Sequence, residues 1–374
     1  MKIIMVANTG WYLANFRLGL VRRLIEIGHE VVAVAPMQAD DTRLAAAGAR
    51  TINLRLSRNG LNPATEAATV VQLRRAFAAE SGDIVLSYTP KGTIYSALAL
   101  AGRQERLVVN ISGLGRAFAP QSRLRQLSKA LYRYALGRAA HVFFENNHDR
   151  DMFVANGIVR ADRSERIPGL GVDLVRFAPG VVPPASRADA DTVFLFVGRL
   201  LWDKGLAEFA EAARRVRAAN PAVVFQILGF IEPPSVAAVP QATVDGWIAE
   251  GIIDYLGTTQ DVRGVMLAAD CIVLPSYYPE GVPRSLLEAA ALGLPIVTTD
   301  STGCRDAVDD GSTGYLAQPR DAADLAERLL AFVRLAPAAR QSMGAAARAK
   351  MVAQFDETHV LDRNLSIIAA NALP

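Results

Sequence analysis

A strand pattern followed by a helix pattern recurs along almost the whole of this 374-residue chain. Near the start, the apolar run "KIIMVAN" precedes "FRLGLVRRLIEIGHE", whose apolar residues have helical spacing, and "VVAVAP" then returns as a strand. The runs "DIVLSY", "RLVVNIS" and "HVFFEN" continue the pattern. Because parallel strands need a crossover helix to connect them, this alternation predicts an α/β fold, with a parallel sheet covered by helices on both faces.

The alternation stops once and then starts again, which predicts two doubly wound domains. The interruption, "IPGLGVDLVRFAPGVVPPAS", is rich in Pro and Gly and lacks periodicity, as is typical of a linker. After it, "VFLFVGRL", "VVFQILG", "CIVLP" and "PIVTT" read as strands separated by helices. We therefore expect a first domain over residues 1–173, a linker over 174–190 and a second domain over 191–354. In such a protein the ligand binds beyond the carboxyl ends of the strands, in the cleft between the domains.

Several other classes of protein do not fit the composition. The chain contains no run of 18 apolar residues that would predict a transmembrane helix. Its start, "MKIIMVAN", reads as a buried strand and lacks the layout of a secretory signal. The two cysteines, Cys271 and Cys304, are far apart and form no disulfide or metal-binding pattern. The simplest expectation is a reducing, cytoplasmic environment.

Charge is unevenly distributed between the two halves. The formal net charge is only +3, but residues 1–173 contain 23 Lys and Arg against 14 Asp and Glu. The stretch 107–140 has no acidic residue, and its basic side chains alternate with apolar and aromatic ones. Such a basic amphipathic helix can lie on anionic lipid, hold a pyrophosphate or simply face solvent. Nucleic acid is not expected, because no recognition module accompanies the charge. The basic residues of this stretch are Arg116, Arg123, Arg125, Lys129, Arg133 and Arg138.

Two glutamates stand eight positions apart in "EGVPRSLLEAAALGLP", which follows an apolar strand. Gly281 can adopt unusual backbone angles, and Pro283 suits the first position of a helix. The unpaired N–H groups at the start of this helix would form an anion site. Glu288 lies roughly 7.5 Å further along the helix axis, where a carboxylate could accept hydrogen bonds from ribose hydroxyls. Glu280 would lie on the other side of the phosphate, although an ordinary helix with surface glutamates fits the spacing as well.

Two cations mark another junction between a strand and a helix. In "FVGRLLWDKG" a strand ends at Gly198 and Arg199, and Lys204 opens the next helix. Cations at such a junction can hold a diphosphate, or they can be plain surface charges. Near the start of the chain, the turn "NTG" leads through Gly10 into a helix, but without the GxGxxG fingerprint of nicotinamide-cofactor domains. No carboxylate or His cluster has metal-ligand spacing.

Together these segments resemble the family 4 glycosyltransferases. The resemblance covers most of the chain and is strongest in "GRLLWDKG", "EGVPRSLLE", "ALGLPIVTTDSTGCRDAVDDGSTGYL" and "IPGLGVDLVRF". It implies the GT-B fold, in which two Rossmann-like domains face each other across a cleft. It also implies that a last helix, at about 355–374, crosses back to the first domain. The family retains the anomeric configuration and needs no metal, so we expect neither a metal nor any cofactor beyond the nucleotide sugar.

The resemblance also implies a role for each site residue. Arg199 and Lys204 would neutralise the donor's diphosphate as the sugar leaves, and Glu280 would lie beside that sugar. Glu288 would hold the ribose. The remaining binding residues lie in the loops that would surround the donor: Gly10, Gly198, Gly281, Val282 and Arg284.

Among family members, "WYLANFRLGLVRRLIEIGHEVVAVAP" and "GCRDAVDDGSTGYL" look most like bacterial enzymes that build capsule, O-antigen and lipid-linked glycans. This resemblance implies transfer of an N-acetylhexosamine from a UDP-sugar to an undecaprenyl-diphosphate-linked saccharide. The enzyme would then be peripheral at the inner face of the cell membrane, with the basic stretch Arg116–Arg138 on anionic lipid.

Two alternatives remain open at this point. A UDP-sugar 2-epimerase of the same fold would consume the donor without an acceptor. A non-catalytic nucleotide-sugar-binding subunit would support a partner enzyme. Ser112 keeps this second alternative open, because many family members have a His at the corresponding place, close to the reacting sugar.

Overall fold

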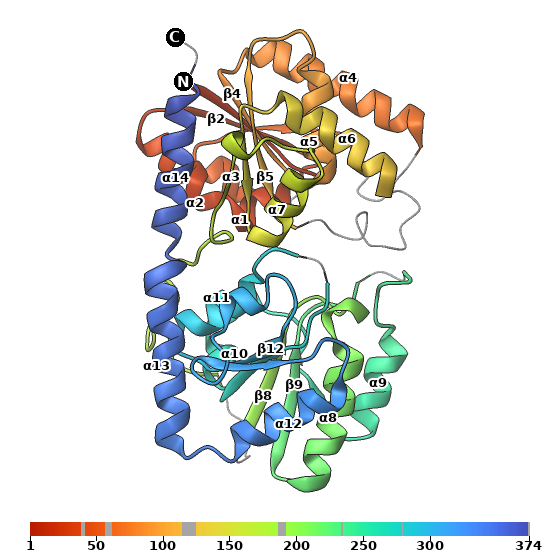
Figure 1. Cartoon of the computed structure of the whole chain (residues 1–374), viewed down its shortest axis with the longest axis vertical. Helices are drawn as coiled ribbons and strands as arrows, with labels where there is room; N and C mark the ends of the chain where they lie inside the picture. Colours follow the sequence, from red (N-terminus) through yellow and green to blue (C-terminus); the bar gives the residue numbers. More distant parts are fainter. Residues whose placement is uncertain are drawn as a thin grey trace. The chain divides into compact units, whose positions relative to one another are not determined.

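The computed structural model describes residues 1–38, 42–56, 62–113, 125–185, 192–232, 235–278 and 280–372. The chain divides into two compact units, Met1–Leu170 with Thr358–Pro374 and Gly171–Glu357. Each unit contains one sheet of parallel strands with helices packed against it (Figure 1). Part of the segment whose composition suggested a linker packs in the second unit, because Phe177 is buried in the core of that unit.

The first unit is built on a seven-stranded parallel sheet with the order β3-β2-β1-β4-β5-β6-β7. Its strands are β1 (Lys2–Val6), β2 (Glu30–Ala35), β3 (Arg50–Asn53), β4 (Ile84–Tyr88), β5 (Arg106–Ile111), β6 (His141–Phe144) and β7 (Ser164–Arg166). Its helices are α1 (Gly10–Phe16), α2 (Leu18–Glu26), α3 (Thr42–Ala46), α4 (Pro63–Glu80), α5 (Pro90–Ala99), α6 (Arg125–Arg138), α7 (Asn147–Ala155), the short 3₁₀ turn η3 (Ala161–Arg163) and α14 (Glu357–Ala370).

Alternate residues of these strands pack in two separate cores, one on each face of the sheet. Ile4 and Val6 of β1 face one side and pack with residues of α4, α5, α6 and α7. Ile3 and Met5 face the other side and pack with residues of α1, α2, α3 and α14. Both faces of the sheet are therefore apolar, which explains why the strands read as nearly continuous hydrophobic runs.

The second unit has a six-stranded parallel sheet with the order β10-β9-β8-β11-β12-β13. Its strands are β8 (Thr192–Val197), β9 (Val223–Leu228), β10 (Asp254–Tyr255), β11 (Cys271–Leu274), β12 (Ile296–Thr299) and β13 (Gly314–Ala317). Its helices are α8 (Leu206–Ala219), α9 (Gln241–Ala249), α10 (Arg263–Leu267), α11 (Arg284–Ala291), α12 (Ala322–Val333) and α13 (Pro337–Gln354), with the 3₁₀ turns η4 (Trp202–Lys204) and η5 (Arg305–Ala307).

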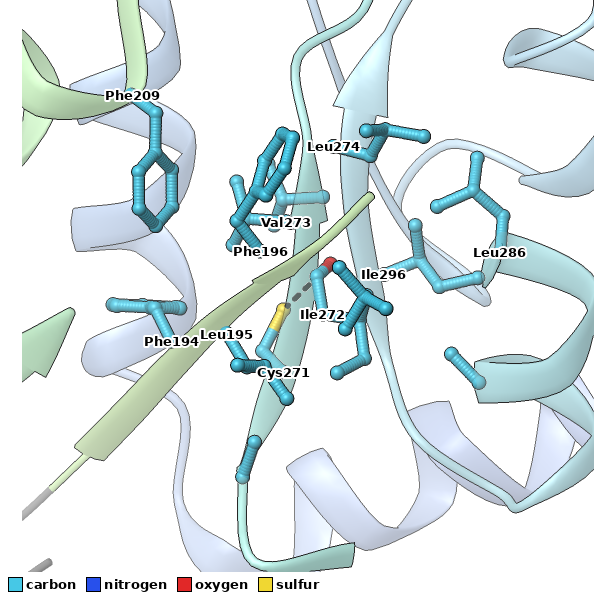
Figure 2. Packing of buried hydrophobic residues seen from close by; sticks show 14 of the residues in the cluster. Phe194, Leu195, Phe196, Phe209, Cys271, Ile272, Val273, Leu274, Leu286 and Ile296 are labelled. Atoms are coloured by element: carbon cyan, nitrogen blue, oxygen red, sulfur yellow. Dashed lines mark hydrogen bonds between the residues drawn. The ribbon is translucent and has the colours of Figure 1, made fainter. Parts of the chain in front are cut away.

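Large apolar side chains fill the core of this second unit. Figure 2 shows Phe194 and Phe196 of β8 among the side chains of the neighbouring strands, with Cys271 at the start of β11. The Cys271 thiol is fully buried and contacts the Ile272 carbonyl oxygen at 3.7 Å. Burial raises the pKa of Cys271, so this thiol behaves as a small apolar core residue.

The strand order of the second sheet reverses between β8 and β11, which pair in parallel. The connections after these two strands leave the same edge of the sheet in opposite directions, and ligands of doubly wound sheets bind at such a point. The residues that follow β8 and β11 therefore occupy the place where the fold favours a binding site. Within the part of the chain that the structure describes, no helix is both long and apolar enough to span a bilayer.

Candidate active site

The turn η4 lies close to the segment that follows β11. Gly205, at the end of η4, has a φ of +78°, and a Cβ there would lie 2.0 Å from the carbonyl oxygen of Pro275. Nearby, the Tyr277 N–H donates a hydrogen bond of 3.0 Å to the carbonyl oxygen of Asp203. Glycine is required at position 205 both for its backbone angle and for this close approach.

This approach brings Lys204 to Glu280, two residues that are far apart in the sequence. The Lys204 ammonium donates to Glu280 Oε1, and Ser276 Oγ donates to the same oxygen at 3.0 Å. The side chains of Lys204 and Glu280 are 9% and 19% exposed. The ammonium also lies 5.7 Å from the centre of the Tyr278 ring, within the range of a cation–π contact. Two of the three predicted catalytic residues thus form a largely buried ion pair.

The loop after β12 also contacts the segment after β11 that carries Glu280. Gly303 has a φ of +83°, and a Cβ there would lie 2.2 Å from the carbonyl oxygen of Gly281. Ser301 Oγ donates to the Ser276 carbonyl oxygen at 2.8 Å, and Thr299 Oγ1 donates to the same carbonyl. These contacts fix the backbone that carries Ser276 and Glu280.

Glu288 lies on α11, which begins one residue later than the sequence suggested. Pro283 is the N-cap residue of α11, and Arg284 is its first helical residue. The Arg284 Nε donates to Glu288 Oε1 at 2.7 Å, one helical turn away. Burial raises the pKa of Glu288, and the Arg284 guanidinium opposes that shift. Val282, just before the helix, packs in the core and anchors its start.

Arg199 also has a carboxylate partner, which sequence reasoning missed. Its Nη1 lies 3.0 Å from Oε1 of Glu232, in the loop after β9. The sequence "LGFIEPP" around Glu232 contains no motif, and Gly229 directly after the strand is its only signal. Gly198, the other predicted residue at this point, donates its N–H to the Leu228 carbonyl oxygen at 3.0 Å. All three predicted cations of this unit, Arg199, Lys204 and Arg284, are paired with glutamates.

Gly10 lies in the first unit, as the first residue of α1 after the turn that follows β1. Its N–H donates to the Pro36 carbonyl oxygen at 2.8 Å, and the Thr9 side chain caps α1 by accepting from the Tyr12 N–H at 3.1 Å. The structure therefore brings the eight predicted residues of the second unit to one edge of its sheet and places Gly10 separately, at the carboxyl end of β1 in the first.

A buried polar cluster, which we define as Arg17, Tyr88, Asn110 and Glu145, lies near the carboxyl ends of β4, β5 and β6. The Arg17 guanidinium lies 4.4 Å from the centre of the Tyr88 ring, and one of its nitrogens lies 3.9 Å from Glu145 Oε1. Among the described residues, neither polar atom of the Asn110 amide has a hydrogen-bond partner. Burial raises the pKa of Tyr88, so its hydroxyl stays protonated. Sequence reasoning did not single out Arg17.

Side chains of the kind that bind metals do not gather within the described ranges. No group of three or more His, Cys, Asp or Glu residues is placed there so that it could hold a metal ion. The charged groups that meet at the carboxyl edge of the second sheet are instead ion pairs of Arg or Lys with Glu.

Comparison with known proteins assigns both halves of the chain. Residues 13–169 match the model of a glycosyl transferase 4-like domain, and residues 191–334 match that of the glycosyl transferases group 1. The N,N'-diacetylbacillosaminyl-diphospho-undecaprenol alpha-1,3-N-acetylgalactosaminyltransferase of Campylobacter jejuni is 27% identical over 343 residues, 88% of each chain. The UDP-Gal:alpha-D-GlcNAc-diphosphoundecaprenol alpha-1,3-galactosyltransferase of Escherichia coli is 28% identical and covers 68% of this chain and 67% of its own.

Solved structures agree on the fold. Anabaena Alr3699/HepE, in complex with UDP-glucose, superposes with a TM-score of 0.78 over 99% of this chain and 100% of its own, at 18% sequence identity. Two parallel sheets with helices on both faces, in this order along the chain, form the GT-B architecture. The two domain models together span most of the sequence, and the chain therefore belongs to the family 4 glycosyltransferases of the GT-B fold.

Proposed function

We propose that this glycosyltransferase transfers a sugar, with retention of configuration, from a UDP-sugar to a lipid-linked saccharide. The observation that carries the proposal is the Lys204–Glu280 ion pair, which joins the loops after β8 and β11 at the point where the strand order of the second sheet reverses. Arg199 stands in the same loop as Lys204, directly after β8. Cations at such a point suit a diphosphate, and a carboxylate held beside them suits the sugar that the diphosphate carries.

In this proposal each charged residue of the site contacts a different part of the donor. Arg199 and Lys204 neutralise the negative charge that grows on the diphosphate as the sugar leaves, which lowers the energy of the transition state. Glu280 lies beside the donor sugar, and Glu288 accepts hydrogen bonds from the ribose hydroxyls. The backbone of Gly281 and the start of α11 at Arg284 line the nucleotide.

Gly198 and Val282, in supporting loops, and Gly10, at the start of α1, complete the proposed binding residues. The donor is a substrate in this scheme, and the reaction needs neither a metal nor another cofactor. We suggest that the departing phosphate takes the proton of the attacking hydroxyl, since Ser112, unlike a His, is not a general base at neutral pH.

The acceptor is inferred from the relatives. The Campylobacter jejuni and Escherichia coli enzymes are both named for substrates linked to diphospho-undecaprenol, and the former transfers an N-acetylhexosamine. An acceptor of this kind requires an approach to the membrane. We propose that the enzyme is peripheral at the inner face of the cell membrane, and that α6 provides the contact through Arg133 and Arg138 together with the exposed Leu127 and Tyr134. Arg116 and Arg123, from the same basic stretch, lie outside the described residues.

The donor is tested by thermal stabilisation with UDP, GDP and ADP. A nucleotide at about 100 times its Kd should raise the free energy of unfolding by about 2.7 kcal/mol. We expect stabilisation by UDP that is lost in Glu288→Ala and kept in Glu327→Ala, a control at an exposed position of α12. Stabilisation by GDP or ADP alone would change the proposed donor, and no stabilisation by any of the three would contradict a nucleotide-sugar site.

The acceptor and the two alternative functions are tested by product analysis. With UDP-sugar and undecaprenyl-diphosphate-linked saccharide, the purified protein should release UDP only when the acceptor is present. Conversion of the donor to an epimer without acceptor would identify an isomerase. Nucleotide binding without turnover would identify a non-catalytic subunit.

A further inference from the structure

We propose that Glu232 is a positioning residue that holds the Arg199 guanidinium in the orientation needed to contact the donor's diphosphate. This inference rests on the proposed function, because it takes Arg199 as a phosphate-binding residue. It adds a carboxylate outside the four segments that carry the family resemblance, and it defines what that carboxylate does.

The contact leaves most of the guanidinium available. Arg199 Nη1 lies 3.0 Å from Glu232 Oε1, and the structure shows no other hydrogen bond from this guanidinium to a described residue. A guanidinium carries five N–H donors in a planar fork, so a single bond at one end leaves the rest for a ligand. The Arg199 side chain is 35% exposed, whereas the Glu232 side chain is only 15% exposed. The carboxylate is thus set into the protein, and the guanidinium faces outward from it.

The backbone holds Glu232 in this place. The end of β9 and the loop after it are joined to the loop after β8 by two hydrogen bonds, Gly198 N–H to Leu228 O at 3.0 Å and Leu200 N–H to Phe230 O at 3.2 Å. A Cβ at Gly229 would lie 1.8 Å from the Gly198 carbonyl oxygen, so only glycine permits so close an approach. Glu232 follows three residues after Gly229, so these contacts hold the chain that leads to it beside the loop of Arg199.

A free arginine side chain would have to be ordered by the ligand. Its rotamer freedom is worth about 2 kcal/mol, and a partner that fixes it in advance removes part of that cost from binding. A carboxylate near a phosphate site also repels the phosphate, so its presence requires a compensating role. Orientation of the one cation it contacts is such a role, and a neutral hydrogen-bond acceptor of the same shape would preserve it.

The test compares two substitutions that separate shape from charge. Glu232→Gln keeps an acceptor oxygen for Arg199 Nη1 but removes the charge, and Glu232→Ala removes both. For each protein we would measure Kd for UDP and for UMP, and kcat and KM for the sugar donor. The ratio of the UMP and UDP dissociation constants isolates contacts to the second phosphate. Glu250→Gln and Glu250→Ala are matched controls, because Glu250 pairs with Arg214 at 2.8 Å on the surface of the same unit.

The positioning role predicts that Glu232→Ala reduces the preference for UDP over UMP about tenfold, the equivalent of one charge-assisted hydrogen bond. It also predicts a lower kcat. Glu232→Gln should keep both values within about threefold of the wild type, and the Glu250 variants should change neither. Tighter UDP binding in both Glu232 variants would overturn the proposal, since it would mean that Glu232 acts only as a repelling charge. A loss of thermal stability with unchanged UDP preference would also overturn it.

The wild-type protein separates this inference from the proposed function. If wild-type protein binds neither UDP nor UMP, the nucleotide-sugar site itself is refuted. If it prefers UDP and Glu232→Ala keeps that preference, only the role of Glu232 is refuted.

Discussion

Gly205 packs directly on the carbonyl group of Pro275, and this contact places Lys204 beside Glu280. The two halves of the ion pair come from loops after different strands, and glycine is the residue that lets those loops touch. This ion pair therefore depends on a position that carries no functional group.

The first prediction follows from this contact. Gly205→Ala should abolish most transfer activity and lower the free energy of unfolding by about 2 kcal/mol or more, because the new methyl group would collide with Pro275 at a backbone angle that disfavours alanine. Gly251→Ala is the control, since Gly251 has a φ of +69° with nothing within 4 Å of the added Cβ. Gly251→Ala should lower the free energy of unfolding only by the strain of the backbone angle. Equal effects of the two substitutions would contradict a role for the Pro275 contact.

Glu280 should be needed for transfer and not for nucleotide binding. Glu280→Gln keeps the size of the side chain and an acceptor for Ser276 but removes the charge beside the donor sugar. We expect kcat to fall on the order of a hundredfold, with the UDP-induced thermal shift preserved. Glu327→Gln should leave kcat unchanged. Retained transfer in Glu280→Gln would remove this carboxylate from the mechanism.

Glu288 should reduce stability at neutral pH when no nucleotide is bound. Burial raises its pKa above the ordinary value of 4.5, so the folded state binds this proton more tightly than the unfolded state does. Its contribution to folding is fully present below pH 4.5 and is lost as the pH rises through the folded-state pKa. Glu288→Gln should therefore be more stable than the wild type at pH 7, with the difference shrinking towards pH 4.

Bound nucleotide should reverse the order of stability of the wild type and Glu288→Gln. With saturating UDP at pH 7 the wild type should become the more stable protein, because glutamine lacks the carboxylate proposed for the ribose hydroxyls. Urea denaturation at pH 4, 5.5 and 7, with and without UDP, measures both effects. A variant that is less stable than the wild type at pH 7 without ligand would show that the bond from Arg284 outweighs the cost of burial.

The buried polar cluster should be a stabilising element of the first unit. Arg17 and Glu145 are 4% and 5% exposed, and Arg17→Met would remove a buried guanidinium that lies 3.9 Å from Glu145 Oε1 and packs on the Tyr88 ring. We expect a loss of about 3 kcal/mol in the free energy of unfolding. Arg17→Met combined with Glu145→Gln should lose less, since it removes both charges. Hydrogen exchange of the β4 and β6 amides measures the first unit directly, and equal losses in the single and double variants would exclude charge coupling.

Local signals in the sequence were sufficient for most of the fold. The apolar run "VVFQILG" forms β9, and one of the helices expected between the strands of the second domain is α9, Gln241–Ala249. The last helix, expected at about 355–374, is α14. β9 and α9 were predictable because glycine or proline marks their ends, with Gly229 directly after β9 and Pro240 directly before α9.

The pairing of charges at the site was not predictable in the same way. Arg199, Lys204 and Glu288 stand in recognisable segments, but the contact between Lys204 and Glu280 depends on the parallel pairing of β8 with β11. Glu232 stands in a turn without any motif, and its contact with Arg199 depends on the close approach of Gly229 to Gly198. Such contacts depend on how the folded backbone brings separate segments together, so the hydrophobic periodicity of one segment cannot predict them.

The helix α14 completes the first unit although its residues are made after the entire second unit. Val360 and Ile368 of α14 pack in the same core as Ile3 and Met5 of β1. At a synthesis rate of roughly 5–20 residues per second, translation of Gly171–Glu357 takes on the order of ten seconds or more. During that time the core of the first unit lacks the side chains of α14. The second unit is continuous in sequence and can fold as soon as it leaves the ribosome. On the nascent chain, the unit that emerges first is therefore the last to be finished.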